Sequence, residues 1–79
     1  PFCSARVYVS QGEAEIAAAV DGVALAYPAV EVGSYPRFDN ADHKVKITLE
    51  SKDAAQVAEA MRALLGALPR SSVVRSEGP

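Results

Sequence analysis

The 79-residue sequence contains a single cysteine, Cys3, and a single histidine, His43. One cysteine cannot form a disulfide within the chain or build a thiolate metal cluster, and one histidine argues against a histidine-rich metal site. Basic residues are not in excess either, because eight Lys and Arg stand against ten Asp and Glu and give a formal net charge of −2. We therefore expect neither nucleic acid nor a membrane as partner.

Long apolar runs and phosphate-binding glycine motifs are also missing. No run approaches the roughly 20 apolar residues that span a bilayer, and the five glycines are too scattered to form a P-loop or a dinucleotide-binding motif. With 49% hydrophobic and 23% charged residues, the composition is that of a single small folded domain over residues 1–79. The slightly acidic composition leads us to expect a cytoplasmic protein, or an organellar one. Because the chain starts with Pro1, we expect it to be a fragment of something longer.

What is present is a regular alternation of strand and helix patterns. Period-two alternation and β-branched residues predict four strands, at 5–9, 30–38, 45–50 and 72–76. Apolar residues at helical spacing predict two helices, at 11–27 and 52–68. Each predicted helix is followed by a proline, which cannot continue it.

Serines precede both predicted helices. We expect Ser10 to cap the first helix in a capping box with Glu13, and Ser51 to cap the second. In the core, the spacing predicts Leu49 on a strand and Leu65 on the second helix to be nearly fully buried.

The two halves of the chain form a weak internal repeat. A shift of 41 residues places Ser10 on Ser51 and Pro28 on Pro69, which gives the order β-α-β-β-α-β. This order predicts an α+β, ferredoxin-like plait whose antiparallel four-stranded sheet has the first and third strands in the centre and both helices on one face. Pro36 cannot donate a hydrogen bond to a neighbouring strand, so the strand over 30–38 should lie at an edge.

A sheet covered on one face leaves its other face open. Alternation predicts that this open face carries Arg6, Tyr8, Glu31, Gly33, Tyr35, Lys46, Thr48 and Glu50. RNA-recognition sheets need aromatic residues on both central strands, and here the third strand has none. We expect either a solvated face with cross-strand ion pairs such as Arg6–Glu50 and Lys46–Glu31, or an interface.

Candidate catalytic groups are few. Cys3 has no apparent cation or helix N-terminus beside it to activate its thiol, so we interpret it as a small apolar residue beside the core. His43 should be a solvated turn residue. Asp39, Asp42 and His43 could be drawn as a metal triad, but such turns are usually only turns. We therefore predict no catalytic residue, no metal site and no cofactor within these residues.

The segment at 30–38 is the most distinctive in the chain. Gly33 should adopt a backbone conformation closed to other residues, form a bulge or allow a close approach, and Pro36 should set the exit of the chain. Two interpretations remain open. Tyr35 and Phe38 could cover the end of the core, or Ser34, Tyr35 and Arg37 could be presented to a ligand or a neighbouring domain. The candidate binding or interface residues are Gly33, Ser34, Tyr35, Pro36 and Arg37.

The run EVGSYPRF at 31–38, followed by VKITLES at 45–51, resembles the region behind the molybdopterin-binding-like domain of eukaryotic FAD synthases. It is also similar to the matching region of bacterial competence/damage-inducible A proteins, where that region is called KH-like. The opening ARVYVSQGEAEIAAAV at 5–20 fits the same pattern, so the resemblance covers about 5–75. Gly33 to Pro36 serve as its signature and not as a demonstrated site.

The resemblance implies an accessory role, because the catalytic residues of that family lie in other domains. This chain would pack on or beside the adjoining catalytic domain of the same protein, or help it to dimerise. The KH-like name does not imply RNA binding here, since the glycine-bracketed basic loop of nucleic-acid KH domains is missing. The alternative is a free-standing ferredoxin-like domain that binds a small ligand or forms a dimer.

Overall fold

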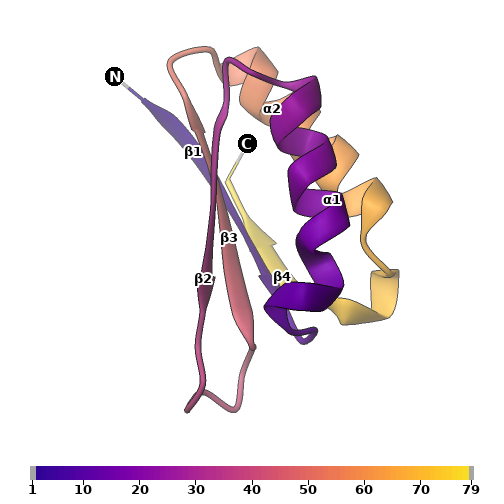
Figure 1. Ribbon diagram of the computed structural model, residues 1–79. Coiled ribbons are helices and arrows are strands. Elements are labelled where there is room, and N and C mark those ends of the chain that lie inside the picture. The colour runs from indigo at the N-terminus through magenta and orange to yellow at the C-terminus, as the bar shows by residue number, and fades with distance from the viewer. Residues whose placement is uncertain (1, 79) are drawn as a thin grey trace.

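The computed structural model describes residues 2–78, in which two helices cover one face of a four-stranded sheet (Figure 1). The elements are β1 (Cys3–Val9), α1 (Glu13–Ala26), β2 (Glu31–Pro36), β3 (Val45–Ser51), α2 (Ala54–Ala67), a 3₁₀ turn (Arg70–Ser72) and β4 (Val73–Glu77). The strand order is β2-β3-β1-β4 and every neighbouring pair is antiparallel. The predicted α+β, ferredoxin-like plait is confirmed, including the central β1–β3 pair and the edge position of β2.

Both helices begin two residues later than the serines suggested. The N-caps are Gly12, whose amide donates to Glu15 Oε1 at 2.7 Å, and Asp53, whose Oδ1 accepts from the amides of Ala55 and Gln56. The prediction of serine caps was wrong because the serines belong to the preceding strand ends.

Those strand ends use the two serines differently. Ser10 Oγ donates to the carbonyl of Ser72 at 3.3 Å, and Ser51 lies within β3 opposite Cys3. The internal repeat is nevertheless present in the structure. The first residue of α2, Ala54, lies at the predicted shift from the first residue of α1, Glu13, and both helices have 14 residues.

The core lies between the helices and the inner face of the central strands. The inward side chains of β1 and β3 are almost inaccessible to solvent: Ala5, Val7, Val9, Val45, Ile47 and Leu49. From α2, Val57, Ala60, Met61 and Leu64 are buried. Leu49 is buried as predicted, but Leu65 is only half-buried, because Leu64 takes the central position and Leu65 falls on the flank of the helix.

The first helix is bound to the sheet by fewer buried residues than the second. Only Ile16 and Val23 of α1 are buried, and Leu25 points into solvent with 84% of its surface exposed. Within residues 2–78, neither helix has the length and the apolar character of a membrane span.

Candidate functional site

The candidate residues lie on the edge strand β2 and just beyond it. Gly33 is opposite Thr48 and Tyr35 is opposite Lys46, in a regular antiparallel register without a bulge. Within residues 2–78 the only glycine with a positive φ is Gly78. The prediction that Gly33 adopts a special conformation or a bulge was therefore wrong, because the β2–β3 pairing holds it in ordinary strand geometry.

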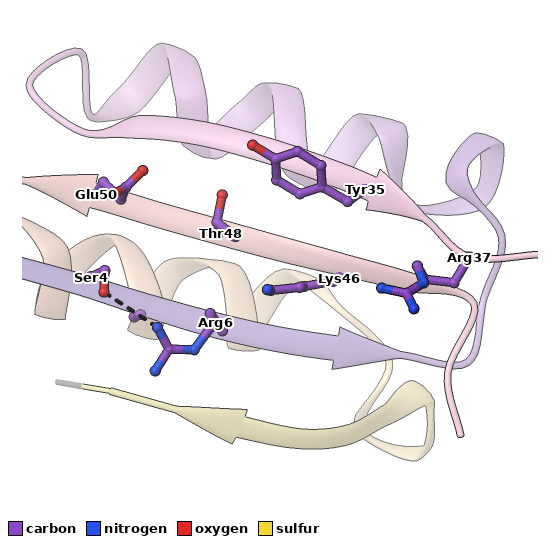
Figure 2. Close-up of a pocket in the computed structure, with 8 residues that line it drawn as sticks. Ser4, Arg6, Tyr35, Arg37, Lys46, Thr48 and Glu50 are labelled. Atoms are coloured by element: carbon purple, nitrogen blue, oxygen red, sulfur yellow. Dashed lines mark hydrogen bonds between the residues drawn. The ribbon is translucent and has the colours of Figure 1, made fainter. Parts of the chain in front are cut away.

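What Gly33 does provide is room for the side chain of Tyr35. A Cβ atom on Gly33 would lie 3.2 Å from Tyr35 Cε2 and 3.1 Å from Thr48 Oγ1. Figure 2 shows the ring of Tyr35 lying over the sheet toward Thr48. An aromatic ring that folds over a glycine on an edge strand shields the exposed backbone there. The group that closely approaches the backbone of Gly33 is therefore the side chain of Tyr35 on the same strand.

Tyr35 and Phe38 do not cover the end of the core. Tyr35 is 55% exposed and Phe38 is 95% exposed, which contradicts the first of the two interpretations of this segment. The physical reason is their position: Tyr35 projects from the face of the sheet opposite the helices, and Phe38 follows the end of β2 in the β2–β3 connection.

The open face of the sheet is hollowed beside Tyr35. This hollow has a volume of about 370 Å³ and is lined by Ser4, Ala5, Arg6, Tyr35, Arg37, Lys46, Thr48 and Glu50. It therefore gathers three cationic side chains, one carboxylate and one aromatic ring from three strands and one loop. Such a surface can bind an anionic group or a complementary protein surface.

The structure brings only part of the candidate set to this hollow. Tyr35 and Arg37 line it, and Gly33 lies beneath the ring of Tyr35. Ser34 faces the helix side, where its Oγ donates to Glu13 Oε2 at 2.9 Å. Pro36 borders a different, smaller depression beside Phe38. Four other lining residues were predicted from strand alternation to face outward, without being assigned to a site: Arg6, Lys46, Thr48 and Glu50.

The other half of the open face, along β1 and β4, is closed by side chains. Tyr8 is only 9% exposed and His43 only 7% exposed, so the predictions of an exposed Tyr8 and a solvated His43 were wrong. The ring of His43 packs edge-on against Tyr8 at 4.8 Å between centroids, and the guanidinium of Arg75 lies 4.1 Å from the centroid of Tyr8. The amide of Lys44, which donates to the carbonyl of Val9 at 2.8 Å, anchors the β2–β3 connection here.

Two carboxylates connect these side chains. Asp42 Oδ2 contacts His43 Nδ1 at 2.9 Å and accepts a hydrogen bond from Arg75. Both contacts lower the pKa of Asp42, and the hydrogen bond with His43 has the larger effect. Glu77 Oε1 accepts from Arg6 Nε at 2.9 Å and from the hydroxyl of Tyr8 at 3.1 Å. The pKa of Glu77 is lowered by these two hydrogen bonds, that of Arg6 being the stronger. We call these six residues the Tyr8 network: Arg6, Tyr8, Asp42, His43, Arg75 and Glu77.

The predicted cross-strand ion pairs do not form. Arg6 is directly opposite Glu77 on β4, whereas Glu50 is opposite Ser4 and therefore only diagonal to Arg6. Lys46 and Glu31 are further apart, because Lys46 is opposite Tyr35 and Glu31 is opposite Glu50. The strand register therefore determines the partner of Arg6, because it places Glu77 directly opposite Arg6.

No group of three His, Cys, Asp or Glu side chains among residues 2–78 is arranged to hold a metal ion. In the Asp39, Asp42 and His43 triad considered above, Asp42 and His43 contact each other, but the carboxylate of Asp42 forms an ion pair with Arg75. Cys3 is half-buried on β1 and packs against the core, in agreement with its interpretation as a small apolar residue.

Fold and surface together define a small ferredoxin-like domain with one closed and one open half of its polar sheet face. A protein-family model described as "FAD synthase, middle domain" matches residues 1–77. The chain belongs to this family, which confirms the FAD synthase part of the resemblance. A comparison with curated proteins found no match.

Proposed function

We propose that this chain is a non-catalytic accessory module of an FAD synthase-type protein in flavin or nucleotide pyrophosphate metabolism. The module packs on the adjoining catalytic domain of the same chain or helps it to dimerise, and it needs no cofactor of its own. The observation that supports this proposal is the family match over residues 1–77, because the matching family is a middle domain.

The open half of the sheet face is the surface that we assign to this contact, made either with the catalytic domain or with a second copy of the module. Exposed aromatic residues beside cationic ones are typical of protein interfaces, and Tyr35 and Arg37 form such a group at one end of β2. The closed half offers no comparable surface, since its aromatic residue is already covered by Arg75 and His43.

An activity measurement tests the non-catalytic part of the proposal. The 79-residue chain is incubated with FMN and ATP, and separately with FAD or ADP-ribose, with magnesium present. We expect no FAD formation and no pyrophosphate hydrolysis. Turnover that a point substitution within these residues abolishes would overturn the accessory role.

Association with the catalytic domain is tested in the longer protein that contains this module. The Tyr35→Ala, Arg37→Ala double variant should weaken the protection of the catalytic domain against limited proteolysis, while the far-ultraviolet circular dichroism stays unchanged. Leu25→Ala on α1 is the control, because Leu25 is also exposed but lies on the helix side. Equal protection in the wild type and the double variant would contradict this surface.

The alternative, a free-standing domain that binds a small ligand, is favoured by one observation. The hollow of about 370 Å³ is within the size range of small-molecule sites and contains Arg37 and Lys46. Calorimetric titration with FMN, FAD and ATP discriminates between the two functions. Saturable binding that Arg37→Ala abolishes would support the alternative.

The finer details of the proposal rest on the sequence. The signature Gly33-Ser34-Tyr35-Pro36 and the VKITLES segment support a molybdopterin-binding-like adjoining domain and the KH-like classification. The composition and the net charge of −2 support a cytoplasmic or organellar location and partners that include neither nucleic acid nor a membrane. Reading the coding sequence on either side of these residues tests the first of them directly.

A further inference from the structure

The outer face of the β2–β3 hairpin carries like charges directly opposite one another. Glu31 is opposite Glu50 at one end of the hairpin. At the other end, the amide of Arg37 donates to the carbonyl of Lys44 at 2.7 Å, which places these two basic residues side by side, next to Lys46. Like charges at opposed positions destabilise a strand pair. The arrangement therefore does not serve the isolated hairpin.

These charges are also not neutralised within the described part of the chain. The ion pairs among residues 2–78 all belong to the Tyr8 network on the β1–β4 side. Lys52, near Glu50 in sequence, lies over the ring of Phe2 at 5.9 Å from its centroid. The open half thus has an acidic end, with Glu31 and Glu50, and a basic end, with Arg37 and Lys46.

The two ends are related to each other in a self-complementary way. Glu31 is the first residue of β2 and Arg37 directly follows its end, six positions further along the chain, which corresponds to about 20 Å in extended backbone. A twofold axis that lies between two facing sheets and runs across the strands reverses the strand direction while keeping β2 over β2 and β3 over β3. Such a rotation places the basic end of each copy on the acidic end of the other.

The middle of the hairpin fits this axis. Halfway between the two ends are Ser34 and Ile47, which are paired across the strands and whose side chains face inward. On the outer face, the ring of Tyr35 lies over Gly33 of its own chain, close to the axis, so the Tyr35 rings of the two copies would face each other there. Two aromatic rings in contact prefer offset or edge-on packing, which such a pair can adopt across the axis.

We propose that the outer face of β2 and β3 binds a second copy of this chain, which gives a twofold-symmetric dimer with the helices on the outside. The inference deepens the dimerising role proposed above and rests on it. Because the contact is polar and exposed, the dimer is weak, and its dissociation constant rises with salt concentration.

Charge exchange between the two ends tests this dimer. Self-association of the 79-residue chain is followed by sedimentation velocity over a concentration series at low salt. Glu50→Lys leaves the acidic end without net charge, because Glu31 is then its one remaining carboxylate, and Lys46→Glu lessens the positive charge of the basic end. The dissociation constant of each variant alone should therefore rise at least about tenfold. An equimolar mixture of the two variants should associate more tightly than either one alone, since the unchanged basic end of the Glu50→Lys chain then meets the unchanged acidic end of the Lys46→Glu chain.

Matched controls lie on the helix side. Glu59→Lys and Arg62→Glu make the same changes in net charge at exposed positions of α2, and they should leave self-association unchanged. A measurement that needs no variant is the concentration dependence of amide chemical shifts, which should be confined to β2, β3 and their connection.

Several results would overturn the dimer. These are a wild-type chain that stays monomeric at every concentration at low salt, an equal effect of the α2 controls, or chemical-shift changes on the helices. None of these results bears on the absence of FAD formation by the module, so the failure of the dimer remains distinguishable from the failure of the accessory role.

Discussion

The two halves of the open sheet face show how similar residues reach different states. Tyr8 and Tyr35 both project from the uncovered face and both have arginine nearby, yet Tyr8 is 9% and Tyr35 is 55% exposed. Tyr8 lies on a central strand, where β4 supplies Arg75 and the β2–β3 connection supplies His43. Tyr35 lies on an edge strand with no strand beyond it. The first half is therefore part of the scaffold, and the second is available for contacts.

The largest expected effect comes from truncating the two tyrosines. Tyr8→Ala should lower the free energy of unfolding by about 3 kcal/mol, because it removes a nearly buried aromatic ring. Tyr35→Ala should change it by less than about 1 kcal/mol, as for other exposed residues. Urea unfolding followed by circular dichroism measures both. Equal losses would show that the two halves do not differ in their structural role.

A smaller effect is expected at His43. Its ring is buried against Tyr8, so His43→Ala should cost about 1–2 kcal/mol through the lost edge contact and packing. Lys44→Ala, at the exposed neighbouring position, should stay within about 0.5 kcal/mol of the wild type. A neutral His43→Ala variant would mean that the turn histidine is solvated after all.

The carboxylates of the Tyr8 network predict a dependence of stability on pH. The pKa values of Asp42 and Glu77 are lowered in the folded chain. Their contribution is therefore complete above the ordinary carboxyl pKa of about 4 and is lost as the pH falls further through the lowered values.

A matched pair of double variants checks this dependence. Asp42→Asn with Glu77→Gln should flatten the loss of stability in acid, measured by thermal unfolding between about pH 5 and pH 2. Glu31→Gln with Glu50→Gln makes the same change in net charge on the open half. If both double variants reduce the loss of stability in acid equally, the Tyr8 network is not the cause of that loss.

The smallest effect is expected at Gly33. Its backbone is in regular strand geometry, so valine is compatible with it and has the higher strand propensity. The added side chain would press on the ring of Tyr35, which is exposed and can turn away. We expect Gly33→Val to remain within about 0.5 kcal/mol of the wild type in urea unfolding. A loss of several times that size would show that the ring cannot move.

The sequence predicted the fold well and the candidate site only in part. The order of elements, the central strands and the buried Leu49 followed from periodicity, which is a local property of the chain. The helix starts were placed two residues early because serine is a favourable N-cap wherever it precedes a helical pattern. The local sequence does not show that β3 extends through Ser51 or that β1 ends directly before Ser10. Tyr35 and Arg37 were found on the open face, but Ser34 and Pro36 belong to other surroundings.

By itself, the sequence determined which side chains lie on the inner and outer faces of the strands, because alternation and helical spacing are encoded residue by residue. It also determined the family, through short runs that need no three-dimensional context. Only the tertiary structure decided which outward residues are covered. The positions of Arg75, Glu77 and His43 over Tyr8 depend on the register of β4 and the path of the β2–β3 connection. Both are set by contacts between segments far apart in sequence, which leave no local pattern.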